Sequence, residues 1–228
     1  MKKLIIVGSC LGRGGTSAMM GLLQLSGINL GGRYTALKGS NKKNPKGHFE
    51  LPSIENGLLR KRMKCYPPTK HAPPPLSWFI ESGNKYGKEF ENIIHKEFGS
   101  VYPIAIKSTR LHLLPLAARI SFTNKVFVIN MVRNKVDRAK SIYRVISEQY
   151  PNTTLMDLIN RVTLWEARAM EIVAAHPQYT YINTSIHKLV KTPYKEFCRI
   201  ASILGIIPPE KHKVKEWIDP KLVNRNGI

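Results

Sequence analysis

Short apolar runs alternate along this chain with longer segments whose apolar residues recur every three or four positions. The runs of strand length are residues 4–7, 102–107, 125–132 and 179–183. The segments with helical spacing are residues 16–25, 51–63, 78–98, 113–120, 137–149, 154–175 and 193–204. Gly83 and Gly87 are candidate breaks in the third of these helices. Strands that alternate with helices predict an α/β fold of three layers, α/β/α, around a mostly parallel central sheet.

The length and the remaining segments fit one domain. A chain of 228 residues can bury one sizeable core. Residues 28–50 are rich in Gly, Lys and Asn, and residues 66–78 are rich in proline, so neither segment suits regular structure. We therefore expect a single domain over residues 1–228, with loop or lid segments at about 28–50 and 66–78.

The chain is strongly basic. Its 36 Lys and Arg residues exceed its 15 Asp and Glu residues, which gives a net charge of +21. Such a charge attracts anions in general. The basic residues are spread along the chain, whereas a dedicated nucleic-acid binder concentrates them in one stripe or tail. The densest cluster, at residues 60–64, is more typical of a solvated helix face. The charge therefore predicts an anionic ligand and no specific nucleic acid.

Cysteine usage and hydropathy indicate the cellular compartment of the protein. Cys10, Cys65 and Cys198 are scattered and lack metal-ligand spacing, which favours a reducing compartment and no disulfide or zinc framework. No apolar run reaches the roughly 18–20 residues that span a bilayer. Residues 1–7 imitate the start of a signal peptide, but the apolar part is too short. We expect a cytoplasmic protein without a transmembrane segment.

A glycine-rich segment, residues 8–17, joins the first strand to the first helix. Glycines permit positive φ and let the backbone close around an anion, and the N–H groups at a helix N-terminus hold phosphate. An arginine in the segment adds a fixed positive charge, and two hydroxyl residues add donors. The segment therefore predicts a phosphate-binding site. Its candidate binding residues are Gly12, Arg13, Gly14, Gly15, Thr16 and Ser17.

The same segment differs from the phosphate loop of ATP and GTP hydrolases. The G-x-x-x-x-G-K-[ST] pattern requires a lysine immediately before Thr16, where this chain has Gly15. None of the predicted strands ends in an aspartate that could hold magnesium. This pattern favours a transfer in which protein cations alone neutralise the moving group. We expect no metal ion in the site.

A second cationic element follows the strand at residues 125–132. This strand delivers Arg133 at its carboxyl end, and Ser141 lies about one turn into the next helix. An arginine and a hydroxyl that converge there suit a second, separate phosphate, because ligands bind beyond the carboxyl ends of parallel strands. Taken alone, the pair is equally well explained by an exposed arginine and an incidental helical serine.

Together, the two elements resemble the sulfotransferase family that uses 3′-phosphoadenosine 5′-phosphosulfate (PAPS). Residues 13–17, Arg-Gly-Gly-Thr-Ser, match the family's [RK]-x-G-T-[ST] loop, which holds the 5′-phosphosulfate. Residues 133–141 match its R-N-P-x-[DE]-R-x-x-S element, which holds the 3′-phosphate, with Lys135 where proline is usual. The resemblance implies the P-loop-type sulfotransferase fold. It also implies that Arg133 and Ser141 bind PAPS, or the product adenosine 3′,5′-bisphosphate (PAP).

Weaker similarities extend over most of the chain. Residues 44–50 are similar to the N-P-x-G-[FYH]-[FW]-E segment of bacterial members, and residues 106–110 to an element at the end of a strand. Residues 179–205 resemble the family's late strand and helix, although Asn-Thr-Ser replaces the usual Tyr-Glu-Asp after the strand. The last residues resemble the family's closing segment, which implies that Arg225 folds back over the cofactor.

Sulfuryl transfer requires cations around the moving group and a base for the acceptor's proton. The resemblance implies that Arg13 and Lys107 supply the cations. Many family members carry a histidine two residues after this lysine, but here that position is Thr109. Glu50 is the preferred base, because other branches of the family use a carboxylate after the first helix, and His48 is the reserve.

Three functions remain open. The first is transfer from PAPS to a hydroxyl or amine of a carbohydrate, lipid, peptide or small molecule. The second is a P-loop nucleotide or small-molecule kinase that uses ATP and magnesium, against which Gly15 and the missing metal aspartate speak. The third is a non-catalytic protein that binds nucleic acid or membrane, and it leaves Arg133 and Ser141 unexplained. We expect the acceptor pocket in the segments at residues 28–50 and 66–78.

Overall fold

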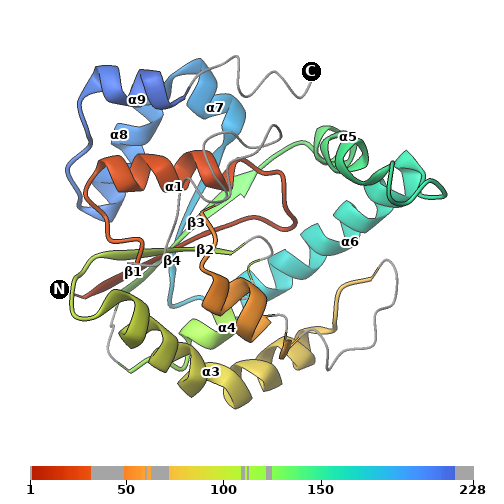
Figure 1. The fold of residues 1–228 in the computed structure, drawn as a ribbon, viewed down its shortest axis with the longest axis horizontal. Coiled ribbons are helices and arrows are strands. Elements are labelled where there is room, and N and C mark those ends of the chain that lie inside the picture. The colour runs from red at the N-terminus through yellow and green to blue at the C-terminus, as the bar shows by residue number, and fades with distance from the viewer. Residues whose placement is uncertain are drawn as a thin grey trace.

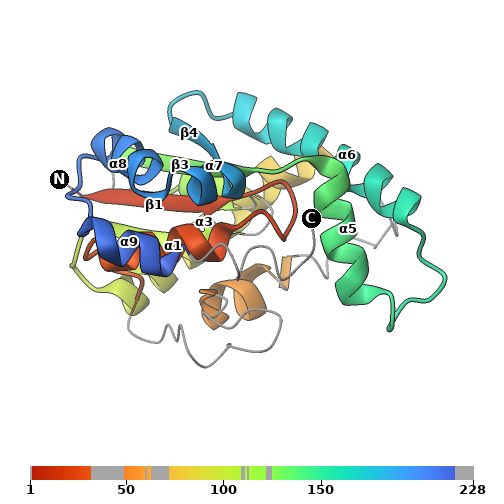
Figure 2. The ribbon, with the colours of Figure 1, turned by 90° about the horizontal axis from the view of Figure 1, so that it is seen from above.

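The computed structural model describes residues 2–31, 49–59, 61–62, 72–108, 111, 113–121 and 125–218. The strands are β1 (Lys3–Gly8), β2 (Ile104–Ser108), β3 (Lys125–Val132) and β4 (Thr180–Ser185). The helices are α1 (Thr16–Leu25), the π-helical turn η1 (Ser53–Leu59), α3 (Leu76–Phe98), α4 (Leu113–Ala117), α5 (Lys135–Ile146), α6 (Leu155–Ala174), α7 (Ile186–Lys191), α8 (Pro193–Leu204) and α9 (Lys211–Trp217). Helices lie on both faces of the sheet (Figures 1 and 2), so the predicted α/β/α fold is confirmed.

The strands of the described sheet are all parallel and lie in the order β2–β1–β3–β4. At the carboxyl end of β1, Gly8 lies opposite Ser108 of β2 and Asn130 of β3. The chain passes from β1 to β2 on one side and then returns to β3 on the other side. In open α/β sheets, ligands bind beyond the carboxyl ends of strands at such a reversal. The fold therefore directs attention to the loops that follow β1 and β3.

Alternate residues of β1 face the two helical layers. Leu4 and Ile6 belong to a core shared with α3, α4 and α6, whereas Ile5 and Val7 belong to a core shared with α1, α8 and α9. Figure 1 shows these two groups of helices on opposite sides of the sheet. All four side chains are completely buried. Burial on both faces explains why this strand is a continuous apolar run rather than an alternating one.

Several elements differ from the sequence prediction. Helix α3 is not broken at Gly83 or Gly87. A Cβ atom at Gly83 would lie 2.6 Å from the carbonyl oxygen of Pro115, so glycine serves here to let α3 approach α4 closely. In its described part the helix predicted at residues 51–63 is mostly the turn η1, and α7 and α9 are not predicted by the pattern. None of the described helices is both long and apolar enough to cross a membrane.

Candidate anion-binding site

The loop between β1 and α1 favours glycine at positions 14 and 15. Gly15 has φ of 91° and Arg13 has φ of 71°, both in the left-handed region. A Cβ atom at Gly14 would lie 3.0 Å from the carbonyl oxygen of Met131, and one at Gly15 would lie 2.9 Å from Cβ of Ile186. The two glycines therefore let the loop pack against the end of β3 and the start of α7.

The amino end of α1 follows directly after this loop. Gly15 is the N-cap residue and has no side chain to bind the first N–H groups of the helix. Around Gly12, no described atom outside its chain neighbours lies within 4 Å of where a Cβ would be. Free N–H groups and the helix dipole make such an end attractive to phosphate or sulfate. This local geometry agrees with the anion-binding loop that the sequence predicts.

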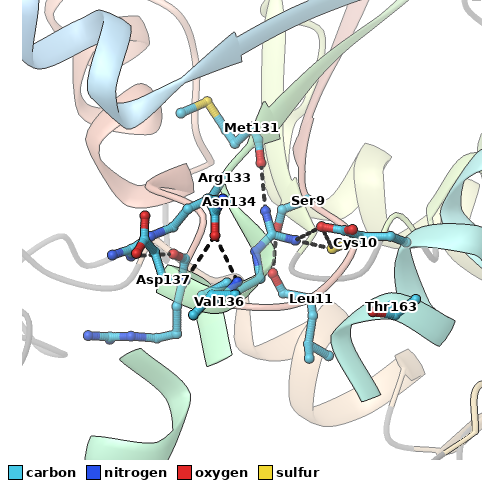
Figure 3. Close-up of polar contacts among 12 residues, drawn as sticks. Ser9, Cys10, Leu11, Met131, Arg133, Asn134, Val136, Asp137 and Thr163 are labelled. Carbon is cyan, nitrogen blue, oxygen red and sulfur yellow. Dashed lines mark hydrogen bonds and ion pairs between the residues drawn. The ribbon is translucent and has the colours of Figure 1, made fainter. Parts of the chain in front are cut away.

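Arg13, Arg133 and Ser141 form one connected group beyond β1 and β3. Arg133 donates from Nη1 to the carbonyl oxygen of Arg13 across 2.9 Å, and Arg13 donates from Nε to Oγ of Ser141 across 3.2 Å. The Nε of Arg133 is buried and has no hydrogen-bond partner among the described residues. Asn134 fixes the start of α5 by accepting hydrogen bonds from the N–H groups of Val136 and Asp137 (Figure 3). The structure thus brings together residues that the sequence assigns to two different phosphates.

The electrostatics of this group favour an anion. Burial lowers the pKa of Arg13, and the nearby Arg144 lowers it further. Burial also lowers the pKa of Arg133; Asp137 raises it, while Arg13, Arg138 and Arg144 lower it. Several guanidinium groups therefore share a partly desolvated space with few opposing carboxylates. A bound phosphate or sulfate would offset their mutual repulsion.

Lys107 approaches the same region from the end of β2. Its side chain is 4% exposed, and its Nζ lies 2.9 Å from Oε1 of Glu50 and 3.2 Å from Oγ of Ser17. Glu50 precedes η1, and Ser17 lies in the first turn of α1. The structure therefore places the predicted cation beside the predicted base and beside the amino end of α1.

A buried polar cluster that the sequence analysis did not assign fixes the loop to the α5–α6 pair. Arg138 is 1% exposed; its guanidinium contacts Sγ of Cys10 and donates from Nη2 to the carbonyl oxygen of Met131 across 3.2 Å. Its Nη1 lies 3.9 Å from Oε1 of Glu166 in α6. Burial raises the pKa of the Cys10 thiol to about 11, although the charge of Arg138 opposes the shift. Arg138 lies inside the 133–141 motif, but no local pattern indicates Glu166.

Some of the remaining predicted residues are described by the structure, and others lie outside the described residues. Thr16 lies in the first turn of α1 and is buried. His48 and Arg225 lie outside the described residues, as do residues 32–47 of the first expected loop segment and residues 66–71 of the second. Within the described ranges, no three His, Cys, Asp or Glu side chains gather as metal ligands would.

A cavity of about 880 Å³ adjoins the loop. It is bounded by residues 11–13, by the second half of α5, by the connection to α6 and by the first turns of α6. This cavity shares Arg13 with the group formed by Arg13, Arg133 and Ser141. The sequence predicts the acceptor pocket at residues 28–50 and 66–78, and none of the described residues that line this cavity belongs to those segments.

Comparison with known proteins identifies the fold. No protein-family model and no curated protein matches the sequence. Among solved structures, the chain is similar to the sulfotransferase domain from the Synechococcus PCC 7002 olefin synthase, with a TM-score of 0.54 and 13% sequence identity over 100% of this chain and 88% of that chain. The chain has a sulfotransferase-like fold. The fold that the sequence resemblance implies is thus confirmed, from a similarity in structure that sequence identity would not reveal.

Proposed function

We propose that this sulfotransferase-like chain transfers a sulfuryl group from PAPS to a hydroxyl or amine of an acceptor, which is a carbohydrate, lipid, peptide or small molecule. The observation that carries the proposal is the arrangement at the ends of β1 and β3. There the open amino end of α1 lies next to Arg13, Arg133 and Ser141, and Arg133 has a buried Nε without a described partner. A ligand that carries two neighbouring anionic groups fits this arrangement better than a ligand that carries a single anionic group.

The donor would be held at two places. Residues 12–17 would bind the 5′-phosphosulfate through backbone N–H groups, Arg13 and the two hydroxyl residues. Arg133 and Ser141 would bind the 3′-phosphate, with the buried Nε of Arg133 gaining a partner. By resemblance, Arg225 would contribute from the end of the chain.

The reaction is a displacement at sulfur. The acceptor oxygen or nitrogen forms a new bond to sulfur while the bond from sulfur to the bridging phosphate oxygen breaks, so that PAP leaves. Glu50 takes the proton of the acceptor, with His48 as the reserve base. Lys107 and Arg13 neutralise the charge that grows on the bridging oxygen and on the moving group. The ion pair between Lys107 and Glu50 keeps base and cation together at 2.9 Å.

The kinase alternative is less well supported by the same residues. Gly15 occupies the position of the kinase lysine, and its Cβ position is already crowded by Ile186. At the described strand ends, β2 finishes in Ser108 and β3 is followed by Arg133 and Asn134. Neither end offers the carboxylate that magnesium nucleotides require.

Calorimetric titration tests the proposal. The protein should bind PAP without metal more tightly than ATP with magnesium or duplex DNA, and a preference for magnesium ATP would refute the proposal. Arg133→Ala should weaken PAP binding by about tenfold or more and adenosine 5′-phosphate binding much less, because one charge-assisted contact is lost. Arg168→Ala, which removes an arginine paired with Glu171 within α6, is the matched control. Equal weakening of both nucleotides by Arg133→Ala would refute the 3′-phosphate assignment.

A further inference from the structure

Arg138 is a buried cation at the point where the loop before α1 meets the end of β3. The residue is only 1% exposed, which leaves it no surface for a ligand. Its guanidinium contacts Sγ of Cys10 in the loop and donates from Nη2 to the carbonyl oxygen of Met131 across 3.2 Å. A Cβ atom at Gly14 would lie 3.0 Å from the same carbonyl oxygen. Arg138 therefore packs directly against the segment that is proposed to bind the donor.

The positive charge of Arg138 is only partly neutralised by the residues that the structure describes. Its Nε is buried without a described hydrogen-bond partner, and arginine keeps its charge even when it is buried. The carboxylate that pairs with it is that of Glu166 in α6, whose Oε1 lies 3.9 Å from Nη1 and whose side chain is 36% exposed. Cys10 adds no negative charge at neutral pH, because burial raises the pKa of its thiol to about 11. A buried cation paired this loosely costs free energy unless another anion comes near.

The charge of Arg138 also acts on the residue that is proposed to bind the 3′-phosphate. Burial is the main cause of the lowered pKa of Arg133, and Asp137 opposes it. The charge of Arg138 adds to the lowering of this pKa, as do those of Arg13 and Arg144. A site whose charges disfavour a further cation favours an anion, and the burial of Arg138 limits the screening of its charge by salt. The charge of Arg138 therefore favours an anion at Arg133.

We propose that Arg138 is a positioning residue for the donor, whose buried charge strengthens anion binding at the loop and at Arg133 without touching the ligand. The inference rests on the proposed function and adds to it a residue outside the binding contacts. Glu166 then has the opposite effect, because its carboxylate offsets part of the charge of Arg138. A residue that only holds the fold together would make no such distinction between charge and shape.

Two substitutions of Arg138 separate its charge from its contacts. Arg138→Lys keeps the charge and loses the guanidinium, whereas Arg138→Gln loses both. In calorimetric titrations, Arg138→Gln should weaken PAP binding by about tenfold, while Arg138→Lys should keep an affinity within about threefold of the parent protein. Arg168→Gln, which removes the same charge from α6 where Glu171 pairs with it, is the matched control and should bind PAP as the parent does. Equal losses of affinity in Arg138→Lys and Arg138→Gln would overturn the proposal.

Glu166→Gln tests the same charge without changing Arg138, and it stays informative if the two variants of Arg138 do not fold. The amide oxygen can still accept from the Cys10 thiol, whose Sγ lies 3.8 Å from Oε1 of Glu166. PAP affinity should equal that of the parent protein or exceed it by up to about threefold, because the offsetting carboxylate is gone. If the pair only holds the fold together, the same change weakens PAP binding, and that result would contradict the proposal.

The failure of this inference and the failure of the proposed function give different results. If the parent protein does not bind PAP without metal, the proposed function is wrong, and the role of Arg138 falls with it. If the parent protein binds PAP, but Arg138→Lys and Arg138→Gln lose the same affinity or Glu166→Gln binds more weakly, only the role of Arg138 is wrong. A tenfold loss in Arg138→Gln beside undiminished affinity in Glu166→Gln is the result that we expect.

Discussion

Arg13 donates a hydrogen bond from Nε to Oγ of Ser141 across 3.2 Å, although the two residues are separated by 128 positions in the sequence. The sequence motifs assign Arg13 to a 5′-phosphosulfate and Ser141 to a 3′-phosphate. Their contact brings one residue from each motif together beyond the carboxyl ends of β1 and β3. Arg133, which donates to the carbonyl oxygen of Arg13, completes the connection.

The first prediction concerns this contact. Ser141→Ala should weaken PAP binding by about tenfold and leave adenosine 5′-phosphate binding nearly unchanged, because a hydroxyl that binds a charged phosphate is lost. In the double variant of Ser141→Ala and Arg13→Ala, the losses of PAP affinity caused by the two single substitutions should not add, since the residues are in direct contact. Ser202→Ala, on the exposed side of α8, is the control. Additive effects in the calorimetric cycle would show that the two residues act separately.

The second prediction separates binding from chemistry at Lys107. Lys107→Gln should lower the rate of sulfuryl transfer by a factor on the order of 10²–10³, because a preorganised cation at the developing charge is lost. PAP affinity should change little. The variant is compared with Lys125→Gln, which alters an exposed lysine at the opposite end of the sheet, at the start of β3. A loss of PAP affinity as large as the loss of rate would assign Lys107 to donor binding.

The third prediction concerns pH and Glu91. Glu91 accepts hydrogen bonds from Nζ of Lys88 at 2.7 Å and from the N–H of Ser121 at 2.8 Å, and also from the Ser121 hydroxyl. The contact with Lys88, followed by those with Ser121, lowers the pKa of Glu91 from 4.5 to about 2. A lowered pKa stabilises the fold above the ordinary pKa, and this contribution is lost as the pH falls from 4.5 toward 2.

Denaturant titrations across this pH range measure the effect. Glu91→Gln should be less stable than the parent protein at pH 6, and the difference should narrow as the pH falls below 4.5. Glu89→Gln removes an exposed partner of Lys61 and should have little effect at any pH. A difference for Glu91→Gln that is constant with pH would contradict the assigned contacts.

The fourth prediction concerns Gly21 in the middle of α1. An exposed glycine-to-alanine change within a helix normally stabilises it by about 1 kcal/mol. Here a Cβ atom would overlap the indole ring of Trp217, whose Nε1 donates to the carbonyl oxygen of Ala18 across 2.8 Å. We therefore expect Gly21→Ala to lower the melting temperature and shift the tryptophan fluorescence. Gly57→Ala, where a Cβ would lie 3.8 Å from the carbonyl oxygen of Pro52, should not destabilise the protein.

Much of the fold follows from local periodicity. The predicted bounds of β3 and α1 are those observed, because an apolar run and a three-to-four spacing are properties of neighbouring residues. The conformation of the glycine-rich segment is also determined locally, since a positive φ at Gly15 and a helix start without a side-chain cap depend only on the residues of that segment. Gly83 shows the limit of such reasoning: whether a helical glycine breaks the helix or permits close packing depends on Pro115, far away in the chain.

The sequence by itself determined the alternation of strands and helices and the glycine-rich turn between β1 and α1, and it singled out Arg133 and Ser141, which both contact Arg13 in the structure. Only the tertiary structure decided which of these side chains touch. The ion pair of Lys107 with Glu50, the burial of Arg138 between Cys10 and Glu166, and the cavity beside Arg13 all join segments that are distant in sequence. The physical reason is that backbone conformation responds to nearest neighbours, whereas contacts between side chains are fixed by how whole layers pack on the sheet.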